Sequence, residues 1–181
     1  MNFGTYKGEA IVLSRKDFSE ADRILTVYSK EFGKLSLLAK GIKRPKSRKR
    51  GNLEVFSQIK FLAAKTKGLG ILVEVALIES FSYLRKDLKR MALAYYVIEV
   101  IGRITNYEER NERLYELLVK YFGKIENEEG LLKLRESFIF DLLTLLGYWP
   151  KEKTLVNSDQ VLEQIIERKI NSKIVGKRIL T

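Results

Sequence analysis

The sequence predicts an α+β protein in two parts, a small five-stranded barrel at residues 1–80 and an all-α helical domain at residues 81–181. Two observations predict this division. The period of the apolar residues changes near residue 80 from that of strands to that of helices. The charge changes at the same place, from 16 basic and 8 acidic side chains before it to 18 basic and 15 acidic side chains after it.

Five strands are expected before residue 80, at 9–14, 23–28, 34–39, 53–63 and 70–78. In the second segment Ile24, Thr26 and Tyr28 fall on one face, with Leu25 and Val27 on the other. Residues 29–33 are typical of a hairpin loop, in which Gly33 can adopt a positive φ. Five strands with no intervening helix favour a Greek-key barrel of the OB type.

Four helices are expected after residue 80. Apolar residues recur at three- and four-residue steps over 84–104, 114–122, 131–146 and 161–166. Gly147 and Pro150 end the third helix, and Asn157, with Gln160 three positions later, is a candidate N-cap for the fourth.

Composition limits the function classes. The 34 basic and 23 acidic side chains give a net charge of +11, which favours polyanionic partners. The chain has no cysteine and no histidine, so thiolate metal sites and Ser-His-Asp triads are excluded and no cofactor is expected. Residues 1–7 lack the apolar run of a signal peptide, and no apolar stretch is long enough to cross a bilayer. A cytoplasmic protein without membrane contact is the prediction.

The strongest functional signal is the segment 40–50, in which seven of eleven residues are basic and none is acidic. Gly41 and Pro45 disfavour regular structure, which indicates a mobile arm between the third and fourth strands. Clustered like charges repel, so such an arm is expected to meet phosphates, although a solvated loop would show the same composition. The predicted DNA-binding residues are those of the arm together with three that flank the loop between the first two strands: Arg15, Lys16, Arg23, Lys40, Lys43, Arg44, Lys46, Arg48, Lys49 and Arg50.

Other sequence features carry weaker hypotheses. Phe18, Tyr28, Phe56 and Phe61 are candidate platforms for base stacking, although such aromatic residues more often fill a barrel core. Asp17, Glu20 and Asp22 form an acidic cluster that a metal-dependent nuclease could use, although loop carboxylates are usually solvated. An RNA-binding OB module would be served by the same electrostatics as a DNA-binding one.

Several motifs together resemble the start of the RecO family of bacterial recombination and repair mediators. They occur in the family's order at 9–13 (EAIVL), 18–26 (FSEADRILT), 33–34 (GK) and 39–47 (AKGIKRPKS). A looser likeness continues at 84–101 and 138–150. The resemblance implies an OB domain and a helical domain, and a protein that is not an enzyme. It implies binding to single- and double-stranded DNA, annealing of complementary strands, and help in loading RecA onto strands coated by single-stranded-DNA-binding protein (SSB).

The expected partners are RecR and the acidic C-terminal tail of SSB, with RecA indirectly. The sequence departs from the family in two ways. Many members carry a four-cysteine zinc module after the segment that corresponds to 147–150, and this chain has no cysteine. The chain also ends sooner after Pro150 than family members usually do, so part of the helical surface that contacts partners is expected to be missing. No residues are assigned to the SSB-tail site.

Overall fold

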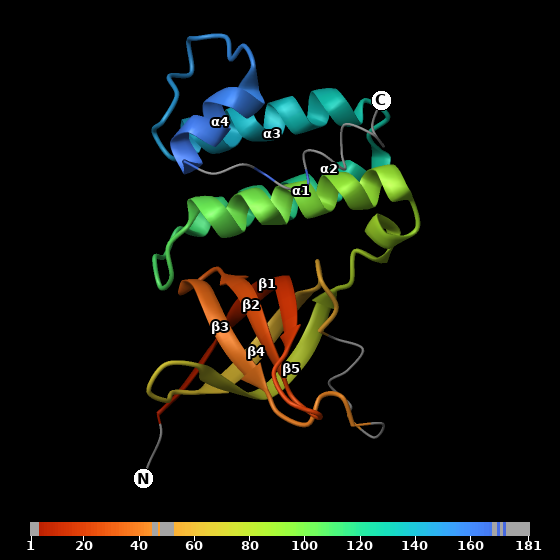
Figure 1. Ribbon diagram of the computed structural model, residues 1–181, viewed down its shortest axis with the longest axis vertical. Helices are drawn as coiled ribbons and strands as arrows, with labels where there is room; N and C mark the ends of the chain where they lie inside the picture. The colour runs from red at the N-terminus through yellow and green to blue at the C-terminus, as the bar shows by residue number, and fades with distance from the viewer. Residues whose placement is uncertain (1–3, 45–46, 48–52, 168–169, 171, 173–181) are drawn as a thin grey trace. The chain divides into compact units, whose positions relative to one another are not determined.

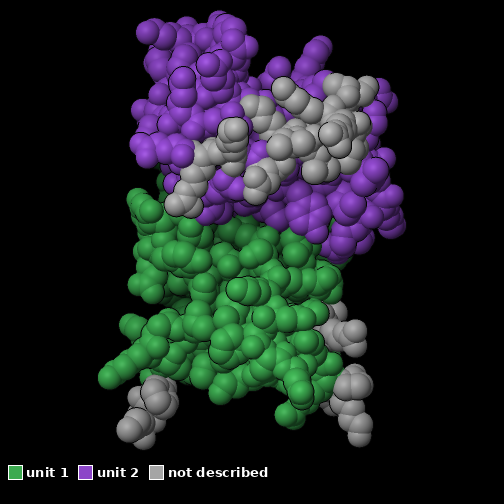
Figure 2. Space-filling view, viewed as in Figure 1, with its two compact units in different colours: residues 1–81, 105–115 green, residues 82–104, 116–181 purple. Residues whose placement is uncertain are grey.

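The computed structural model describes residues 4–44, 47, 53–167, 170 and 172 of the chain (Figure 1). The chain divides into two compact units, one of residues 1–81 with 105–115 and the other of residues 82–104 with 116–181 (Figure 2). The units interleave in sequence because the connection between the first two helices belongs to the first unit. The division into domains at 1–80 and 81–181 stays a prediction.

The first unit is built on a closed barrel in the strand order β1-β2-β3-β5-β4. The strands are β1 (Thr5–Asp17), β2 (Arg23–Ser29), β3 (Gly33–Ala39), β4 (Gln58–Ala64) and β5 (Gly70–Glu79). All neighbours are antiparallel except β3 and β5, which close the barrel through a short parallel pairing at Leu37↔Gly70 and Leu38↔Ile71. The predicted five-stranded OB-type barrel is confirmed.

Alternation along the strands divides the side chains between core and surface. In β2, Leu25 and Val27 point inward, and their partners across the ladder are Leu37 and Leu35 of β3. The predicted face of Ile24, Thr26 and Tyr28 therefore lies on the outside of the barrel. The interior is completed by apolar residues of the remaining strands and of the β3–β4 connection: Ala10, Val12, Ala39, Ile42, Leu53, Ile59, Phe61, Ala63 and Leu72.

The predicted fourth strand begins five residues too early. Residues 54–56 form a bend and turn, and β4 starts at Gln58. Leu53 and Phe56 extend the apolar pattern because both residues are buried, at 2% and 1% exposure. Phe56 has a positive φ of 79°, which is not the conformation of a strand residue. Backbone bonds from Phe56 N to Val12 O and from Val12 N to Ser57 O fix this turn against β1. The apolar pattern over residues 53–57 therefore indicates burial correctly, but the strand that it predicts there is wrong.

Residues 105–115, which are the connection between the first two helices and the first residues of the second helix, pack on the barrel. Tyr107 forms a parallel β-bridge with Lys34 of β3, and Glu108 N donates to Lys34 O at 2.9 Å. Gly33 adopts the predicted positive φ, at 70°, and lies directly against the Glu109 carbonyl. Tyr28 OH also donates to Asn111 O, and the Tyr115 hydroxyl accepts from Gln58 Nε2. The barrel unit is thus completed by a segment that follows it by more than twenty residues in the sequence.

The second unit contains a 3₁₀ turn (Ser82–Arg85) and the four predicted helices. They are α1 (Leu88–Ile104), α2 (Glu112–Asn127), whose first residues belong to the barrel unit, α3 (Leu131–Leu145) and α4 (Ser158–Ile166). Arg135 of α3 is 6% exposed, pairs with Asp159 of α4 and stacks over the Tyr96 ring of α1 at 4.3 Å. This buried group ties three helices together.

The predicted N-cap of α4 is correct in position and wrong in mechanism. Asn157 precedes the helix but adopts a left-handed conformation with φ 54°, and its side chain makes no capping hydrogen bond. Its backbone carbonyl accepts from Gln160 N and Val161 N instead. Asx side chains tolerate the left-handed region better than most residues, which accounts for asparagine at this position.

Candidate nucleic-acid interface

Two loops meet beside the end of β3, and one of them is the start of the predicted basic arm. Gly41 N donates to Asp22 Oδ1 at 2.8 Å, and Lys43 N donates to Ala21 O at 3.0 Å. Gly41 has a φ of 66°, a conformation in which glycine is not strained. The β1–β2 loop (18–22) and the first residues after β3 (40–44) therefore form one ordered surface, which we call the loop platform.

The β1–β2 loop is also closed on itself. Phe18 N donates to Asp22 O at 3.1 Å, and Asp22 N donates to Ser19 Oγ at 3.2 Å. Phe18 is 60% exposed on this closed turn. An exposed aromatic ring held on an ordered loop is available for stacking without a large loss of conformational entropy on binding.

Ion pairs with carboxylates neutralise part of the positive charge of the platform and of the residues beside it. Asp17 accepts from Arg23 Nε at 2.7 Å and from Lys43 Nζ at 3.1 Å. The hydrogen bonds from these two cations lower the pKa of the Asp17 carboxyl below its usual value. On the neighbouring side Arg15 pairs with Glu54 at 2.6 Å. All five groups remain partly exposed, so a phosphate can compete with the carboxylates for these cations.

The other predicted site residues divide into two groups. Lys16, Lys40 and Arg44 are exposed and form no ion pair with any residue that the structure describes. Lys46, Arg48, Lys49 and Arg50 lie outside the described residues. Within the described platform and its flanks six basic side chains face four acidic ones, Asp17, Glu20, Asp22 and Glu54, which leaves a net charge of +2. The four remaining arm residues would raise this to +6.

Next to the platform, the outer face of β2 and β3 carries small and uncharged side chains. Thr26 lies opposite Ser36, and Ile24 lies opposite Leu38, all of them half-buried. The next pair along the ladder, Tyr28 and Lys34, is covered by residues 105–111 and is 0% and 7% exposed. The uncovered part of this face is a strip that a nucleobase can approach without displacing a charge.

Three of the four candidate stacking residues are excluded by burial. Tyr28, Phe56 and Phe61 are 0%, 1% and 3% exposed. Burial raises the pKa of the Tyr28 hydroxyl to about 12, as expected of a phenol removed from water. Phe18 alone of the four is accessible to a base.

The opposite face of the barrel has a different character. A hollow of about 670 Å³ on the outside of β1, β4 and β5 is lined by three carboxylates, Glu9, Glu31 and Glu74, and by two ammonium groups, Lys7 and Lys60. Lys60 pairs with Glu9 at 3.6 Å. This excess of acidic groups opposes a polyanion, so the loop platform is the better candidate for a nucleic-acid interface.

The acidic cluster does not have the geometry of a metal site. Asp17 is held between two cations and Asp22 accepts from the Gly41 amide. In the described parts of the chain no group of three or more acidic, histidine or cysteine side chains is arranged to hold a metal ion. These carboxylates instead connect the two loops of the platform.

Comparisons with known proteins identify the family. Residues 1–81 match the family model described as "Recombination protein O N terminal", and residues 85–171 match "Recombination protein O C terminal". The chain belongs to the RecO family. A "DNA repair protein RecO" from Pelotomaculum thermopropionicum is 36% identical over 145 residues, which cover 80% of this chain and 56% of that protein.

Two further RecO relatives show the same relation. The "DNA repair protein RecO" of Halalkalibacterium halodurans is 34% identical over 149 residues, 81% of this chain and 58% of that protein. The protein of the same name from Desulforamulus reducens is 33% identical over 177 residues, 97% of this chain and 67% of that protein. The chain spans a little over half the length of the first of these curated relatives.

Sequence reasoning on this RecO-family chain missed two contacts that shape the surface of the barrel near the candidate interface. Glu54 neutralises Arg15, and Tyr107 extends the β3 face from a segment assigned to the helical domain. Neither could be found from local periodicity, because each depends on a contact between residues about 40 and 70 positions apart. Among the described helices, none has the length and apolar character needed to span a bilayer.

Proposed function

We propose that this chain binds single- and double-stranded DNA through the loop platform and the basic arm, as a mediator of recombinational DNA repair that acts without covalent chemistry. The observation that carries the proposal is the locking of two loops by Asp22 and Gly41. This contact joins the segment that carries Lys40, Lys43 and Arg44 to the loop that carries the exposed residue Phe18, at the end of an uncharged strand face. Cations for phosphates and an aromatic ring for bases are the two components of a single-strand site on an OB barrel.

Annealing follows from the same surface. Two complementary strands repel each other through their phosphates, and a protein that screens this charge accelerates their encounter while base pairing supplies the free energy. Membership of the RecO family supports a role with RecR in loading RecA onto SSB-coated single strands, with the acidic SSB tail as a second partner. This activity belongs in the cytoplasm, where the chromosome of a bacterium lies.

The deciding experiment measures oligonucleotide affinity against salt concentration. If about four cations contact phosphates of a single strand, log affinity falls against log salt with a slope near −3, at about −0.7 per contact. Replacing Lys43, Arg44, Lys46, Arg48, Lys49 and Arg50 by Ala should weaken binding by orders of magnitude at low salt and flatten this slope. Unchanged affinity and slope in this variant would refute the proposal.

A matched control separates the site from the general effect of net charge. The double variant Lys43→Ala/Arg44→Ala removes two positive charges from the platform, and Lys7→Ala/Lys60→Ala removes two from the opposite hollow. The platform variant should lose affinity and reduce the rate of annealing of complementary oligonucleotides, with or without SSB. The control should retain both. Equal losses would indicate that only overall charge matters.

Two alternative functions, RNA binding and DNA cleavage, can be tested with the same protein and oligonucleotides. Competition between DNA and RNA of one sequence distinguishes a DNA-binding from an RNA-binding OB module. Incubation of labelled DNA with Mg²⁺ or Mn²⁺ tests for a nuclease, whose activity Asp22→Asn should abolish. The engagement of Asp17 and Asp22 in contacts within the platform argues against the nuclease.

A further inference from the structure

Tyr107 is an exposed aromatic residue that the barrel unit holds in place at several points. The residue is 58% exposed. Its backbone forms the β-bridge to Lys34, and the next residue, Glu108, donates its amide to the Lys34 carbonyl. The Lys34 ammonium lies 4.6 Å from the centroid of the Tyr107 ring.

Lys34 is itself fixed beneath the ring. It is only 7% exposed, its Nζ donates to the Thr105 carbonyl, and its burial lowers the pKa of the ammonium group. A cation behind an aromatic ring, together with the bridge, restricts the ring to one orientation. Tyr107 is thus a preorganised surface that needs no ordering when a flat partner stacks on it.

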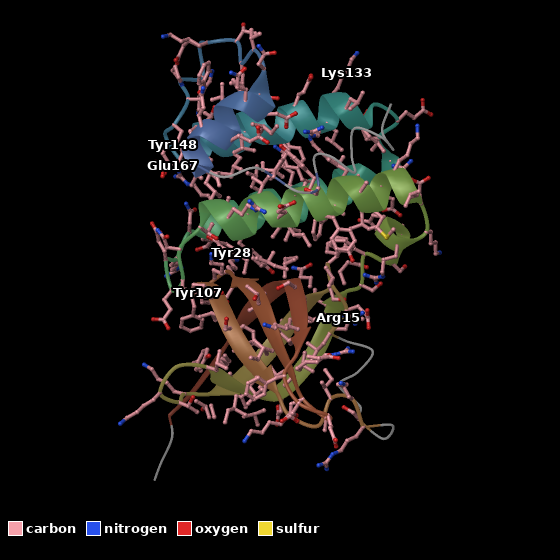
Figure 3. All side chains as sticks on the ribbon, viewed as in Figure 1. Arg15, Tyr28, Tyr107, Lys133, Tyr148 and Glu167 are labelled. Carbon is pink, nitrogen blue, oxygen red and sulfur yellow. The ribbon has the colours of Figure 1, made fainter. Side chains whose placement is uncertain are left out.

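The register places Tyr107 on the face next to the loop platform. Paired residues on neighbouring strands share a face, so Tyr28, Lys34 and Tyr107 form one row across the outside of the barrel. Figure 3 shows Tyr28 and Tyr107 on the same side of the barrel, beside the start of β3. The following rows along the ladder are the uncharged pairs Thr26–Ser36 and Ile24–Leu38.

The length of β3 fits an extended nucleic-acid strand. Lys40 follows Lys34 by six residues, so the Tyr107 row lies roughly 20 Å from the platform at about 3.3 Å per residue. OB barrels cover about 4–16 nucleotides of single strand, so a strand bound at the platform can reach this row. On β2 and β3 the side chains between the two are small or apolar, which suits bases, and Lys16 of β1 lies beside Ile24 at the platform end.

We propose that Tyr107 stacks a nucleobase of bound single-stranded DNA, and that the nucleic-acid face of the barrel therefore extends onto the connection between α1 and α2. This inference rests on the proposed function, because it places one end of the DNA strand at the loop platform. It assigns base stacking to Tyr107 and phosphate binding to the platform. The two contributions respond differently to salt and to removal of the bases.

The test is a binding titration of the full chain with a labelled oligothymidylate of about twenty nucleotides and with an abasic phosphodiester strand of the same length. Tyr107→Ala should lower the affinity for oligothymidylate by roughly 5- to 150-fold, the range for loss of one stacked base, with an unchanged salt slope. It should leave the affinity for the abasic strand unchanged. Tyr107→Leu, which keeps bulk but not the aromatic ring, should behave as Ala does, and Tyr107→Phe should bind as the original chain.

A matched control is Tyr148→Ala, because Tyr148 is 54% exposed in the helical unit and has no place in the proposed face. This variant should bind both strands normally. The inference is overturned if Tyr107→Ala and Tyr107→Leu bind oligothymidylate normally, if they lose affinity for both strands equally, or if Tyr148→Ala loses as much. If the unaltered chain binds neither strand, the proposed function fails and the inference fails with it, an outcome that is distinct from the other three.

Discussion

An alanine substitution at Gly33 tests whether residues 105–115 pack against the barrel. A Cβ on Gly33 would lie 2.0 Å from the Glu109 carbonyl oxygen, which is backbone and cannot rotate away. Gly33 also has a φ of 70°, where alanine is strained by about 1 kcal/mol. Overpacking against a fixed neighbour adds about 1–3 kcal/mol. The Gly33→Ala variant should therefore lose about 2–4 kcal/mol, a large part of the roughly 5–15 kcal/mol that stabilises a typical domain.

Gly41→Ala is the matched control, since Gly41 has nearly the same φ of 66° but only the flexible Arg44 side chain nearby, at 3.7 Å. It should lose only about 1 kcal/mol, from backbone strain alone. Thermal unfolding followed by circular dichroism should show a decrease in Tm of about 4–16 °C for Gly33→Ala and about 2–4 °C for Gly41→Ala, at about 2–4 °C per kcal/mol for a chain of this length. Equal decreases would refute the packing of residues 105–115 against the β2–β3 hairpin.

Three further predictions concern charge and burial. Burial raises the pKa of the Tyr28 hydroxyl in the folded chain to about 12, so as pH rises the unfolded chain loses this proton first. The contribution of the protonated Tyr28 hydroxyl to the free energy of unfolding is complete below pH 10 and is lost as pH rises from about 10 to 12. Chemical denaturation at pH 8 and pH 11 should show a smaller alkaline loss in Tyr28→Phe, by about 1 kcal/mol; an identical loss would contradict a buried phenol. Asp17→Asn releases Arg23 and Lys43 and should strengthen oligonucleotide binding several-fold at low salt. The gain should exceed that of Glu20→Gln, which removes the same charge but breaks no ion pair among the residues that the structure describes; equal gains in the two variants would contradict this explanation. Arg135→Ala breaks the buried pair between α3 and α4 and should cost about 2–4 kcal/mol of unfolding free energy, against less than about 1 kcal/mol for the exposed Lys120→Ala, as measured by urea denaturation.

Much of the barrel could be predicted because its strands alternate cleanly. Leu25 and Val27 face the core and Ile24 and Thr26 face outward, as the period of two requires. The register between strands and the parallel closure of β3 on β5 could not be predicted, since both depend on pairings between distant residues. The early start given to β4 has a related cause: Leu53 is buried as a strand residue would be, but in a connection that covers the core.

The candidate site was predicted in its composition and less well in its arrangement. The basic residues were identified from their density along the chain, which needs no knowledge of the fold. Their pairing with Asp17 and Glu54 was not visible, because each ion pair joins residues that only the closed barrel brings together. The position of Tyr107 beside Lys34 was hidden for the same reason, since Tyr107 lies beyond the whole of α1 in the sequence.

The ion pairs of the platform change how its salt dependence must be interpreted. A cation that already has a carboxylate partner exchanges that partner for a phosphate, and the exposed carboxylate then takes up its own counterions. Lys43 and Arg23 share Asp17, so their phosphate contacts should contribute less than about 0.7 each to the slope. The slope of the original chain therefore undercounts its contacts. Asp17→Asn should therefore make the slope of log affinity against log salt steeper. The size of this increase measures how many phosphate contacts the Asp17 carboxylate removes from the slope of the original chain.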